Sequence, residues 1–398
     1  MEVMPSYKQT EVGVIPEDWG SSSLLAIADC LDNLRIPLND AQRQRMQGDV
    51  PYCGANGVLD YVNDFVIDDD IILMAEDGGY FDQYASRPIA YRMQGKCWVN
   101  NHAHILRAKR GHDQGFLFYS LVHKNILSFI ASGTRAKLNK SEMEKILVAT
   151  PPTEAEQRAI ATALTDVDDL LTSLDRLIAK KRAIKQGVMH DLLTGRKRLP
   201  GFGGKWREVS IGELANVDPE VLPQATDPNY EFNYIALEDV TRGTLRSFQR
   251  LRFATAPSRA RRILRYHDIL IGTVRPNLQS HLLHVRRESS WICSTGFSVV
   301  RCDPSHAWPD FVFHSFFGMN LNNQIATLIA GSNYPAISRR DVAALTIPTP
   351  PLHEQRAIGT VLTDLDDEID ALQARRDKTH AIKQAMMHEL LTGRTRLV

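Results

Sequence analysis

A stretch of about 45 residues occurs twice in this 398-residue chain, and this repeat constrains the fold more than any other sequence feature. Residues 156–200 and 354–398 share about 26 identical positions, including EQRAI, AIKQ and LLTGR. Weaker matches continue outside the stretch: DIILMAED from Asp70 matches DILIGTVR from Asp268. A repeat of this length predicts an architecture built from two copies of one unit.

The repeat divides the chain into alternating variable and near-constant parts. The segments before the two copies also match, since IPEDW ends at Trp19 and LPGFGGKW ends at Trp206. We therefore expect a variable domain at 1–150, a near-constant helix at 151–199, a second variable domain at 200–349 and a second near-constant helix at 350–398.

Apolar residues in both near-constant segments are spaced alternately by four and three positions, which is typical of a coiled-coil seam. At about 40 residues and 1.5 Å per residue, each helix is roughly 60 Å long. One such helix alone usually belongs to a larger bundle, but two copies favour an antiparallel pair that holds two domains apart. The seam residues are Ile160, Leu164, Val167, Leu171, Leu174 and Ile178 in the first copy, and Ile358, Leu362, Leu365, Ile369 and Leu372 in the second.

The ends of these helices carry recognisable signals. Thr153 and Glu156 predict a capping box at the start of the first helix, and Leu352 replaces the threonine in the second copy. Gly195 and Gly393 are suited to end the helices in a left-handed conformation. The lysines at positions 180, 181, 185, 378 and 383 are expected to lie on the outer, solvated faces.

The variable domains contain short β-rich runs, such as DIILMA, YIALEDV and FSVVRC, separated by turns and short helical stretches such as GFLFYSLV. This mixture predicts the α+β class, with two α/β domains separated by two long antiparallel coiled-coil helices in a pseudo-twofold repeat. The acidic run Asp68–Asp70 is expected to form an exposed turn.

A polar loop follows the matched strand in each copy, AEDGGYFDQYASRP in the first and TVRPNLQSH in the second. The flanking frames agree while the loop chemistry differs, which is typical of recognition surfaces on a shared scaffold. An ordinary polar surface loop explains this feature equally well. The side chains suited to base edges are Asp77, Gln83 and Arg87 in the first loop, and Arg275, Asn277 and Gln279 in the second.

Further basic segments would suit phosphate groups, although a solvated basic face is the alternative. The chain has 47 basic and 47 acidic residues, so a nucleic-acid surface must be a local face. RARRILR supplies one cluster, and GTRAKLNK and GSNYPAISRR lie at matching places before the helices. The candidate residues are Arg259, Arg261, Arg262, Arg135, Lys137, Lys140, Asn333, Tyr334 and Arg339.

Sequence motifs for catalysis are missing: there is no GxxxxGK[ST] loop, no nuclease carboxylate motif and no methyltransferase (N/D)PP(Y/F) loop. His102 and His104 alternate along a predicted strand and are expected to be structural rather than metal ligands. The cysteines form no CxxC motif, and no apolar run is long enough to cross a membrane. We therefore expect a cytoplasmic protein without catalytic residues, metal ions or cofactors of its own.

The whole pattern resembles the specificity subunit of type I restriction-modification systems. TPPTEAEQRAI and TPPLHEQRAI, the LLTGR endings and the IPEDW segment carry the resemblance, which covers nearly the whole chain. It implies a non-catalytic subunit that binds double-stranded DNA, with two modification (methyltransferase) subunits docked on the helices and restriction (translocase/nuclease) subunits completing the complex. S-adenosylmethionine, ATP and Mg²⁺ would then belong to the partner subunits.

On this interpretation each variable domain reads one half of a split, asymmetric DNA target. The repeated EQRAI segment would dock the two modification subunits through Gln157 and Arg158, and through Gln355 and Arg356. A coiled-coil adaptor that binds only protein would explain the helices but not the diverged, arginine-rich loops. A stand-alone modification enzyme is disfavoured by the missing catalytic loops.

Overall fold

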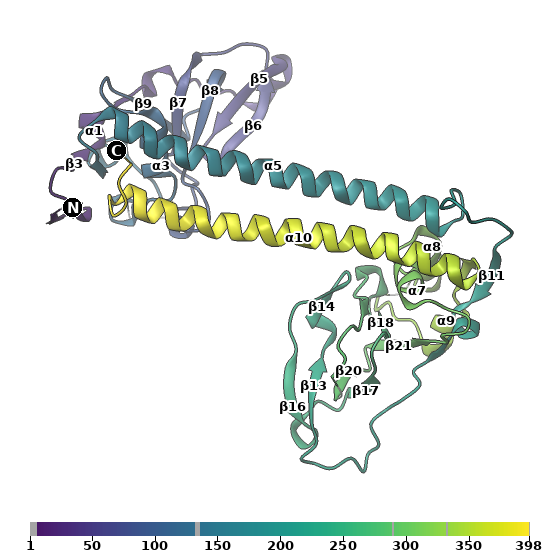
Figure 1. The fold of residues 1–398 in the computed structure, drawn as a ribbon. Coiled ribbons are helices and arrows are strands. Elements are labelled where there is room, and N and C mark those ends of the chain that lie inside the picture. The colour runs from purple at the N-terminus through teal and green to yellow at the C-terminus, as the bar shows by residue number, and fades with distance from the viewer. Residues whose placement is uncertain (1–5, 132–135, 289, 332, 398) are drawn as a thin grey trace. The chain divides into compact units, whose positions relative to one another are not determined.

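The computed structural model describes residues 6–131, 136–288, 290–331 and 333–397 (Figure 1). The chain forms two compact units, and each unit combines one variable domain with half of each long helix. Unit 1 comprises Met1–Asp175 and Arg375–Val398, and unit 2 comprises Arg176–Ala374.

The two long helices are α5 (Glu154–Leu193) and α10 (Leu352–Leu391), each of 40 residues. Ion pairs join their halves within each unit. In unit 1, Lys383 Nζ lies 2.6 Å from Asp168 Oδ1, and in unit 2, Lys181 Nζ lies 2.6 Å from Glu368 Oε1. A second pair in each unit gives the direction: Arg376 pairs with Asp175 in unit 1, and Lys185 pairs with Asp366 in unit 2. In each unit residue numbers rise along α5 as they fall along α10, so the halves pack antiparallel, as predicted.

The expectation that all five lysines would be solvated is wrong for the ones that pair the helices. The side chains of Lys185 and Lys383 are only 18% and 17% exposed. Lys185 forms an ion pair with Asp366, and Lys383 lies over the ring of Tyr119 as well as beside Asp168. Each therefore joins both helices, and Lys383 also joins them to the variable domain of unit 1.

Unit 1 is built on a six-stranded sheet of order β4–β9–β7–β8–β5–β6. The central strand β7 is antiparallel to both neighbours and is buried from Ile71 to Ala75. The strands of this unit are β1 (Tyr7–Thr10), β2 (Gly13–Pro16), β3 (Gly20–Ser23), β4 (Ala28–Cys30), β5 (Gln47–Gly54), β6 (Gly57–Val62), β7 (Ile67–Ala75), β8 (Ala90–Val99), β9 (Ala103–Ala108) and β10 (Leu147–Thr150); its short helices are α1 (Leu24–Ile27), η1 (Asp32–Leu34), α2 (Asp40–Arg45), η2 (Phe81–Gln83), α3 (Gln114–Val122), η3 (Leu127–Phe129) and α4 (Lys140–Met143).

Unit 2 differs from unit 1 in the order of its elements, and its two larger sheets have four strands each, in the orders β12–β21–β18–β19 and β16–β13–β20–β17. The counterpart of β7 is β18, whose four residues are all buried. The strands are β11 (Arg207–Ser210), β12 (Ala215–Val217), β13 (Glu231–Ile235), β14 (Val240–Thr241), β15 (Thr244–Leu245), β16 (Gln249–Arg252), β17 (Ala260–Leu264), β18 (Ile269–Gly272), β19 (Leu282–Leu283), β20 (Trp291–Ser294), β21 (Phe297–Cys302) and β22 (Thr346–Thr349); the short helices are α6 (Ile211–Leu214), η4 (Leu237–Asp239), η5 (Phe253–Thr255), η6 (Pro276–Leu278), α7 (Pro309–Ser315), α8 (Met319–Leu328) and α9 (Arg339–Ala344).

The acidic run Asp68–Asp70 is part of β7, so the expectation of an exposed turn is wrong. Two of its three carboxylates are neutralised by arginines on the neighbouring strands: Arg92 Nε lies 2.7 Å from Asp70, and Arg107 Nη1 lies 2.9 Å from Asp69. Cross-strand pairing of opposite charges makes this strand compatible with three consecutive acids.

The second and third turns of each long helix belong to a hydrophobic core. Ile160 and Leu164 of α5 are buried in the core of unit 1, and Ile358 and Leu362 of α10 are buried in that of unit 2. Part of the predicted coiled-coil seam thus fixes a variable domain to a helix.

The predicted helix ends are confirmed at both glycines, since Gly195 and Gly393 each have φ +69°, in the left-handed region. The capping prediction is half right. The backbone N–H of Glu156 donates to Thr153 Oγ1 at 3.2 Å, whereas the Glu156 carboxylate binds Arg396 instead of returning to the cap.

Candidate nucleic-acid interface

In both units the structure joins two segments that are far apart in the sequence. We call the segment after the central strand the strand-end loop (76–89 in unit 1, 273–281 in unit 2). We call the segment before the short helix the helix-entry loop (136–139 and 333–338). In unit 1 the N–H of Leu138 donates to the Glu76 carbonyl at 2.7 Å, and in unit 2 the N–H of Ile337 donates to the Thr273 carbonyl at 3.0 Å.

The unit 2 loops bring together residues that the sequence predicted for DNA contact. The N–H of Arg275 donates to the Pro335 carbonyl at 2.8 Å, which places Arg275 beside the helix-entry loop with Asn333 and Tyr334. Tyr334 is 86% exposed, and Asn277 is exposed on η6. The structure therefore assembles an arginine, two amides and an aromatic ring on one polar surface.

The strand-end loop of unit 2 has an unusual backbone. Arg275 and Gln279 flank η6 with φ of 50° and 55°, in the left-handed region that non-glycine residues rarely adopt. The Gln279 amide donates to Asn322 Oδ1 of α8 at 2.8 Å, so Gln279 is committed to holding the loop. Backbone strain of this kind persists only where the surrounding structure maintains it, and it is common at functional sites.

The predicted arginine cluster of unit 2 divides into three environments. Arg259 is exposed, and its guanidinium lies 4.0 Å from Glu238. Arg261 lies over the ring of Phe253, 4.9 Å from its centroid. Arg262 is 17% exposed and forms an ion pair with the buried Asp218. The prediction that Arg262 is available for phosphate is wrong, because its guanidinium is paired with a buried carboxylate.

The unit 1 loops place Asp77 opposite Lys137 in an isolated β-bridge. Lys137 Nζ lies 2.9 Å from Glu76, and His102 Nδ1 donates to Asp77 at 2.7 Å. Gln83 is exposed on η2, and Arg87 lies over the ring of Tyr80, 4.2 Å from its centroid.

The remaining candidates lie near the starts of the short helices. Lys140 opens α4, with its Nζ 3.8 Å from Glu144, and Arg339 is exposed in the first turn of α9. Arg135 lies outside the described residues.

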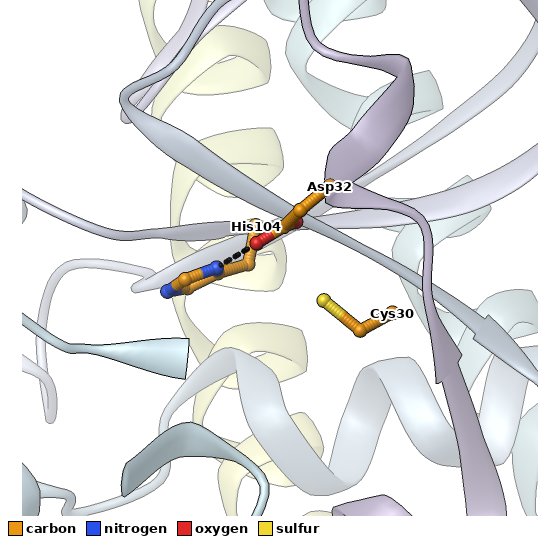
Figure 2. A group of neighbouring side chains, drawn as sticks. All are labelled: Cys30, Asp32 and His104. Atoms are coloured by element: carbon orange, nitrogen blue, oxygen red, sulfur yellow. Dashed lines mark hydrogen bonds and ion pairs between the residues drawn. The ribbon is translucent and has the colours of Figure 1, made fainter. Parts of the chain in front are cut away.

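Beneath the unit 1 loops is a group with the composition of a metal site: Cys30, Asp32 and His104 (Figure 2). The figure shows His104 hydrogen-bonded to Asp32, with the Cys30 thiol beside them. His104 Nδ1 lies 2.7 Å from Asp32, and Nε2 lies 2.8 Å from the Leu138 carbonyl. Both ring nitrogens are therefore engaged, and Arg35 lies 3.2 Å from the same carboxylate. These contacts disfavour a metal cation at this place.

A histidine with the opposite character closes the strand-end loop of unit 2. His281 is fully buried, packs against the rings of Phe316 and Phe317, and accepts from the N–H of Gly272 at 3.3 Å. Burial lowers the pKa of His281 to about 3. The ring is therefore neutral at ordinary pH.

Sequence reasoning missed the joints that attach each variable domain to the helices. In unit 1, Arg396 binds the buried Glu156 at 2.8 Å and lies over the ring of Trp19. Unit 2 repeats the joint with Arg198, which binds Glu354 and lies over Trp206. The arginine, the glutamate and the tryptophan are identical in the two copies, so the sequence repeat could have indicated these joints.

The prediction that Gln157 and Gln355 contact partner subunits is corrected by the structure, because both side chains are buried, at 2% and 1% exposure. The Gln157 amide accepts from the N–H of Asp113 at 2.9 Å, and the Gln355 amide accepts from the N–H of Trp308 at 2.9 Å. Each glutamine thus binds its own variable domain. The neighbouring arginines are exposed: Arg158 pairs with Glu154, and Arg356 lies over Trp308.

Arg158 also lines a cleft of about 220 Å³ between α5 and the variable domain of unit 1. The cleft is lined by residues of both charges, including Arg92, Asp113 and Asp166.

Among the described residues, no helix is long and apolar enough to cross a bilayer.

The chain has two α+β domains with diverged loops, and each domain is fixed to an antiparallel pair of helix segments. This is the architecture of a two-domain recognition subunit. A family model described as the type I restriction modification DNA specificity domain matches residues 16–185 and again 204–379. The chain therefore belongs to the specificity subunits of type I restriction-modification systems, and the resemblance inferred from the sequence is confirmed.

Individual relatives agree with this assignment. The chain is 23% identical to a Methanocaldococcus jannaschii protein named for the specificity subunit of the type I restriction enzyme MjaX, over 98% of this chain and 97% of that one. A Haemophilus influenzae protein, named for the type I specificity subunit S.HindORF215P, is 34% identical over a shorter segment. That segment covers 37% of this chain and 36% of the relative. The fold is similar to the crystal structure of the type I S subunit from M. genitalium, with a TM-score of 0.66, 15% identity and coverage of 98% of this chain and 99% of that one.

Proposed function

We propose that each unit reads one half of a split, asymmetric DNA target as part of a type I restriction-modification complex. One observation carries the proposal: in both units the strand-end and helix-entry loops are joined by an equivalent backbone hydrogen bond, while their side chains differ. A shared connection between the loops with different side chains is what two readers of different sequences require.

The unit 2 surface supplies the chemistry for base reading. Arg275 can bond the acceptors of guanine in the major groove, and Asn277 can pair with adenine. Tyr334, 86% exposed, offers an aromatic face for apolar contact. Arg259 and Arg339 are suited to phosphate groups, whose contacts set register rather than sequence preference.

The unit 1 surface is more acidic. Asp77 can accept from the amino group of cytosine, and Gln83 can pair with adenine. Lys137 and Arg87 supply positive charge near them, and Lys140 follows at the start of α4. Because the two surfaces differ in charge, the two half-sites should differ in sequence.

The long helices are proposed to dock two modification (methyltransferase) subunits, with restriction (translocase/nuclease) subunits joining the complex. Arg158 and Arg356 occupy equivalent exposed places on α5 and α10, and Arg158 borders the charged cleft. These two arginines, predicted for docking together with the glutamines, remain the docking candidates, because the glutamines are buried. The chain itself would be non-catalytic, and S-adenosylmethionine, ATP and Mg²⁺ would act in the partner subunits.

Domain exchange tests this proposal. Residues 20–150 are replaced by the corresponding segment of a relative, and the methylated DNA motif of the host is sequenced with each version. We expect one half of the motif to change and the other half to remain. A simultaneous change in both halves would contradict the assignment of one half-site to each unit.

A protein-binding adaptor remains the competing function. Phosphate contacts release counterions, so DNA binding through this surface should weaken steeply with salt. Binding of the complex to a duplex that carries the methylated motif is measured at 50 and 200 mM salt, with a scrambled duplex as control. Equal, weak binding to both duplexes would favour the adaptor.

A further inference from the structure

The side chains below the unit 1 loops form one connected network of charges. Asp32 at the start of η1 and Glu76 at the start of the strand-end loop are 8% and 12% exposed, and Arg35 lies between them. His104 on β9 is 1% exposed, with its Nδ1 2.7 Å from Asp32 and 3.8 Å from Glu76. Lys137 reaches Glu76 from the helix-entry loop at 2.9 Å.

The geometry fixes the protonation state of His104. A carboxylate oxygen faces Nδ1 at 2.7 Å, and a backbone carbonyl oxygen faces Nε2 at 2.8 Å. Both groups are hydrogen-bond acceptors only, so both ring nitrogens must donate. A neutral imidazole has one N–H, and therefore only the imidazolium satisfies both contacts.

The surroundings favour that charge. Burial alone would lower the pKa of His104, but the contacts with Asp32, with the Cys30 thiol and with the Leu138 carbonyl outweigh it and raise the pKa to about 9. The carboxyls respond in the opposite direction: although burial opposes the shift, His104 lowers the pKa of Asp32, and Lys137 and Arg35 lower the pKa of Glu76. His102 also faces this region, through Asp77.

We propose that His104, as an imidazolium, is a positioning residue that holds the helix-entry loop of unit 1 against its strand-end loop, so that the unit 1 surface comes apart when this histidine loses its proton. The imidazolium binds the Leu138 carbonyl, while the Leu138 N–H binds the Glu76 carbonyl at 2.7 Å. Both backbone polar groups of Leu138 are thus anchored beside Lys137.

Unit 2 shows what the position looks like without this device. The hydrogen bonds place Ser298 at the position of His104, because the N–H of Val299 donates to Asp218 at 2.8 Å as the N–H of Ile105 donates to Asp32 at 3.0 Å. The Ser298 hydroxyl donates to Asp218 at 3.2 Å, but it carries no charge. The connection between the loops therefore forms in unit 2 without the cation that His104 supplies in unit 1.

The consequence for DNA rests on the proposed function, whereas the joint itself is tested without DNA. The full chain is labelled with ¹⁵N-histidine, and the ring nitrogens are followed by NMR from pH 6 to 10, with H104Q identifying the His104 signals. We expect both nitrogens protonated at pH 7 and a titration well above 6.5. A single neutral tautomer at pH 7 overturns the proposal, and so does a shift of the His104 ring signals on adding Zn²⁺, because it would reveal a metal site.

Hydrogen exchange then tests the positioning role. Protection of a peptide covering 136–143, corrected for the intrinsic rate, should fall by up to about tenfold per pH unit above 6.5 in the wild type. In H104Q the protection should be low and independent of pH. The matched control is H380Q, at an exposed histidine of α10 in the same unit, which should behave as wild type. Wild-type protection that does not change with pH overturns the proposal, and because it needs no variant it remains decisive if H104Q fails to fold.

DNA discrimination separates this inference from the proposed function. In the complex with its modification subunits, preference for the unit 1 half-site should fall between pH 7 and 9 while preference for the unit 2 half-site is kept. Loss of protection without any loss of discrimination would leave the joint established and contradict the DNA-reading role of the unit 1 surface.

Discussion

A backbone hydrogen bond joins the two loops of the candidate DNA surface in both units, but charged side chains support it in unit 1, whereas the unit 2 strand-end loop is supported by further backbone contacts and by neutral side chains. The Glu76–Lys137 and His104–Asp32 pairs hold unit 1. In unit 2 the strand-end loop is held by the Arg275–Pro335 backbone hydrogen bond, by the Gln279 amide on Asn322 and by His281 packed against two phenylalanines. The two units therefore support the same backbone connection between the loops with different kinds of side chain.

The attachment of the domains to the helices shows the opposite pattern. Arg396, Glu156 and Trp19 in unit 1 correspond to Arg198, Glu354 and Trp206 in unit 2, and the residue types are identical. Only the outer contacts of the arginines differ: Arg396 also binds Asp18, and Arg198 binds the carbonyls of Gly203 and Gly204. The chain thus keeps its joints constant and varies its loops, as a duplicated recognition subunit should.

Removing the joint arginines should give the largest effect. R396A leaves Glu156, 2% exposed, without its counter-charge, and breaking such a buried pair costs about 3–5 kcal/mol. R198A should cost a similar amount through Glu354 but in the other unit. Thermal unfolding with hydrogen exchange by mass spectrometry would assign each loss to its unit.

The matched control for this experiment is R394A, since Arg394 is 53% exposed. It should change the unfolding free energy by less than about 1 kcal/mol. If R396A and R198A loosened the same unit, or if R394A matched R396A, the equivalence of the two joints would be refuted.

The second prediction uses pH to separate the units. The pKa of His104 is raised from 6.5 to about 9, so its contribution is complete below pH 6.5 and is lost as pH rises through 9. Burial lowers the pKa of His281 from 6.5 to about 3, so its contribution is present above 6.5 and is lost as pH falls. Each should change the unfolding free energy by about 1.4 kcal/mol per pH unit in its window.

Hydrogen exchange measured between pH 4.5 and 9 should therefore show unit 1 weakening on the alkaline side and unit 2 on the acidic side. His314 of unit 2, whose pKa burial also lowers to about 3, acts in the same direction as His281. Loss of protection in the same direction in both units would remove the distinction between a charged and a neutral histidine.

Much of this comparison could be predicted from the sequence, and the rest could not, for physical reasons. The repeat, the antiparallel helices and the location of the loops follow from periodicity and from local end signals such as Gly195. Side-chain partners do not follow, because Gln157, Arg262 and Lys383 look like surface residues in the sequence. Their burial depends on contacts with segments far along the chain, such as Asp113, Asp218 and Asp168.

The third prediction concerns base reading in unit 2. Replacing Arg275 by alanine should cost about 1–3 kcal/mol of discrimination at one base pair. Because Arg275 has φ 50°, R275G is the matched variant that removes the same side chain without backbone strain. Competition binding with single-base variants of the target measures the loss. Equal losses on all duplexes would show that Arg275 contacts phosphate and carries no sequence information.

The smallest effect concerns the outer cations, which the two units use differently. Lys137 lies 2.9 Å from Glu76, so much of its charge is already neutralised within the protein. Arg259, with its guanidinium 4.0 Å from Glu238 and 59% exposed, is better placed to neutralise a phosphate. R259Q should therefore weaken binding to matched and scrambled duplexes alike and reduce the slope of log K against log salt by about one.

The corresponding change in unit 1, K137Q, should reduce that slope by less than half as much, because fewer counterions are released when a pre-neutralised lysine meets DNA. The K137Q E76Q double variant provides the check, since it removes both members of the pair and should return the slope close to the wild-type value. A larger effect of K137Q than of R259Q would mean that Lys137 leaves Glu76 on DNA binding. The unit 1 loops would then rearrange around the target instead of meeting it preformed.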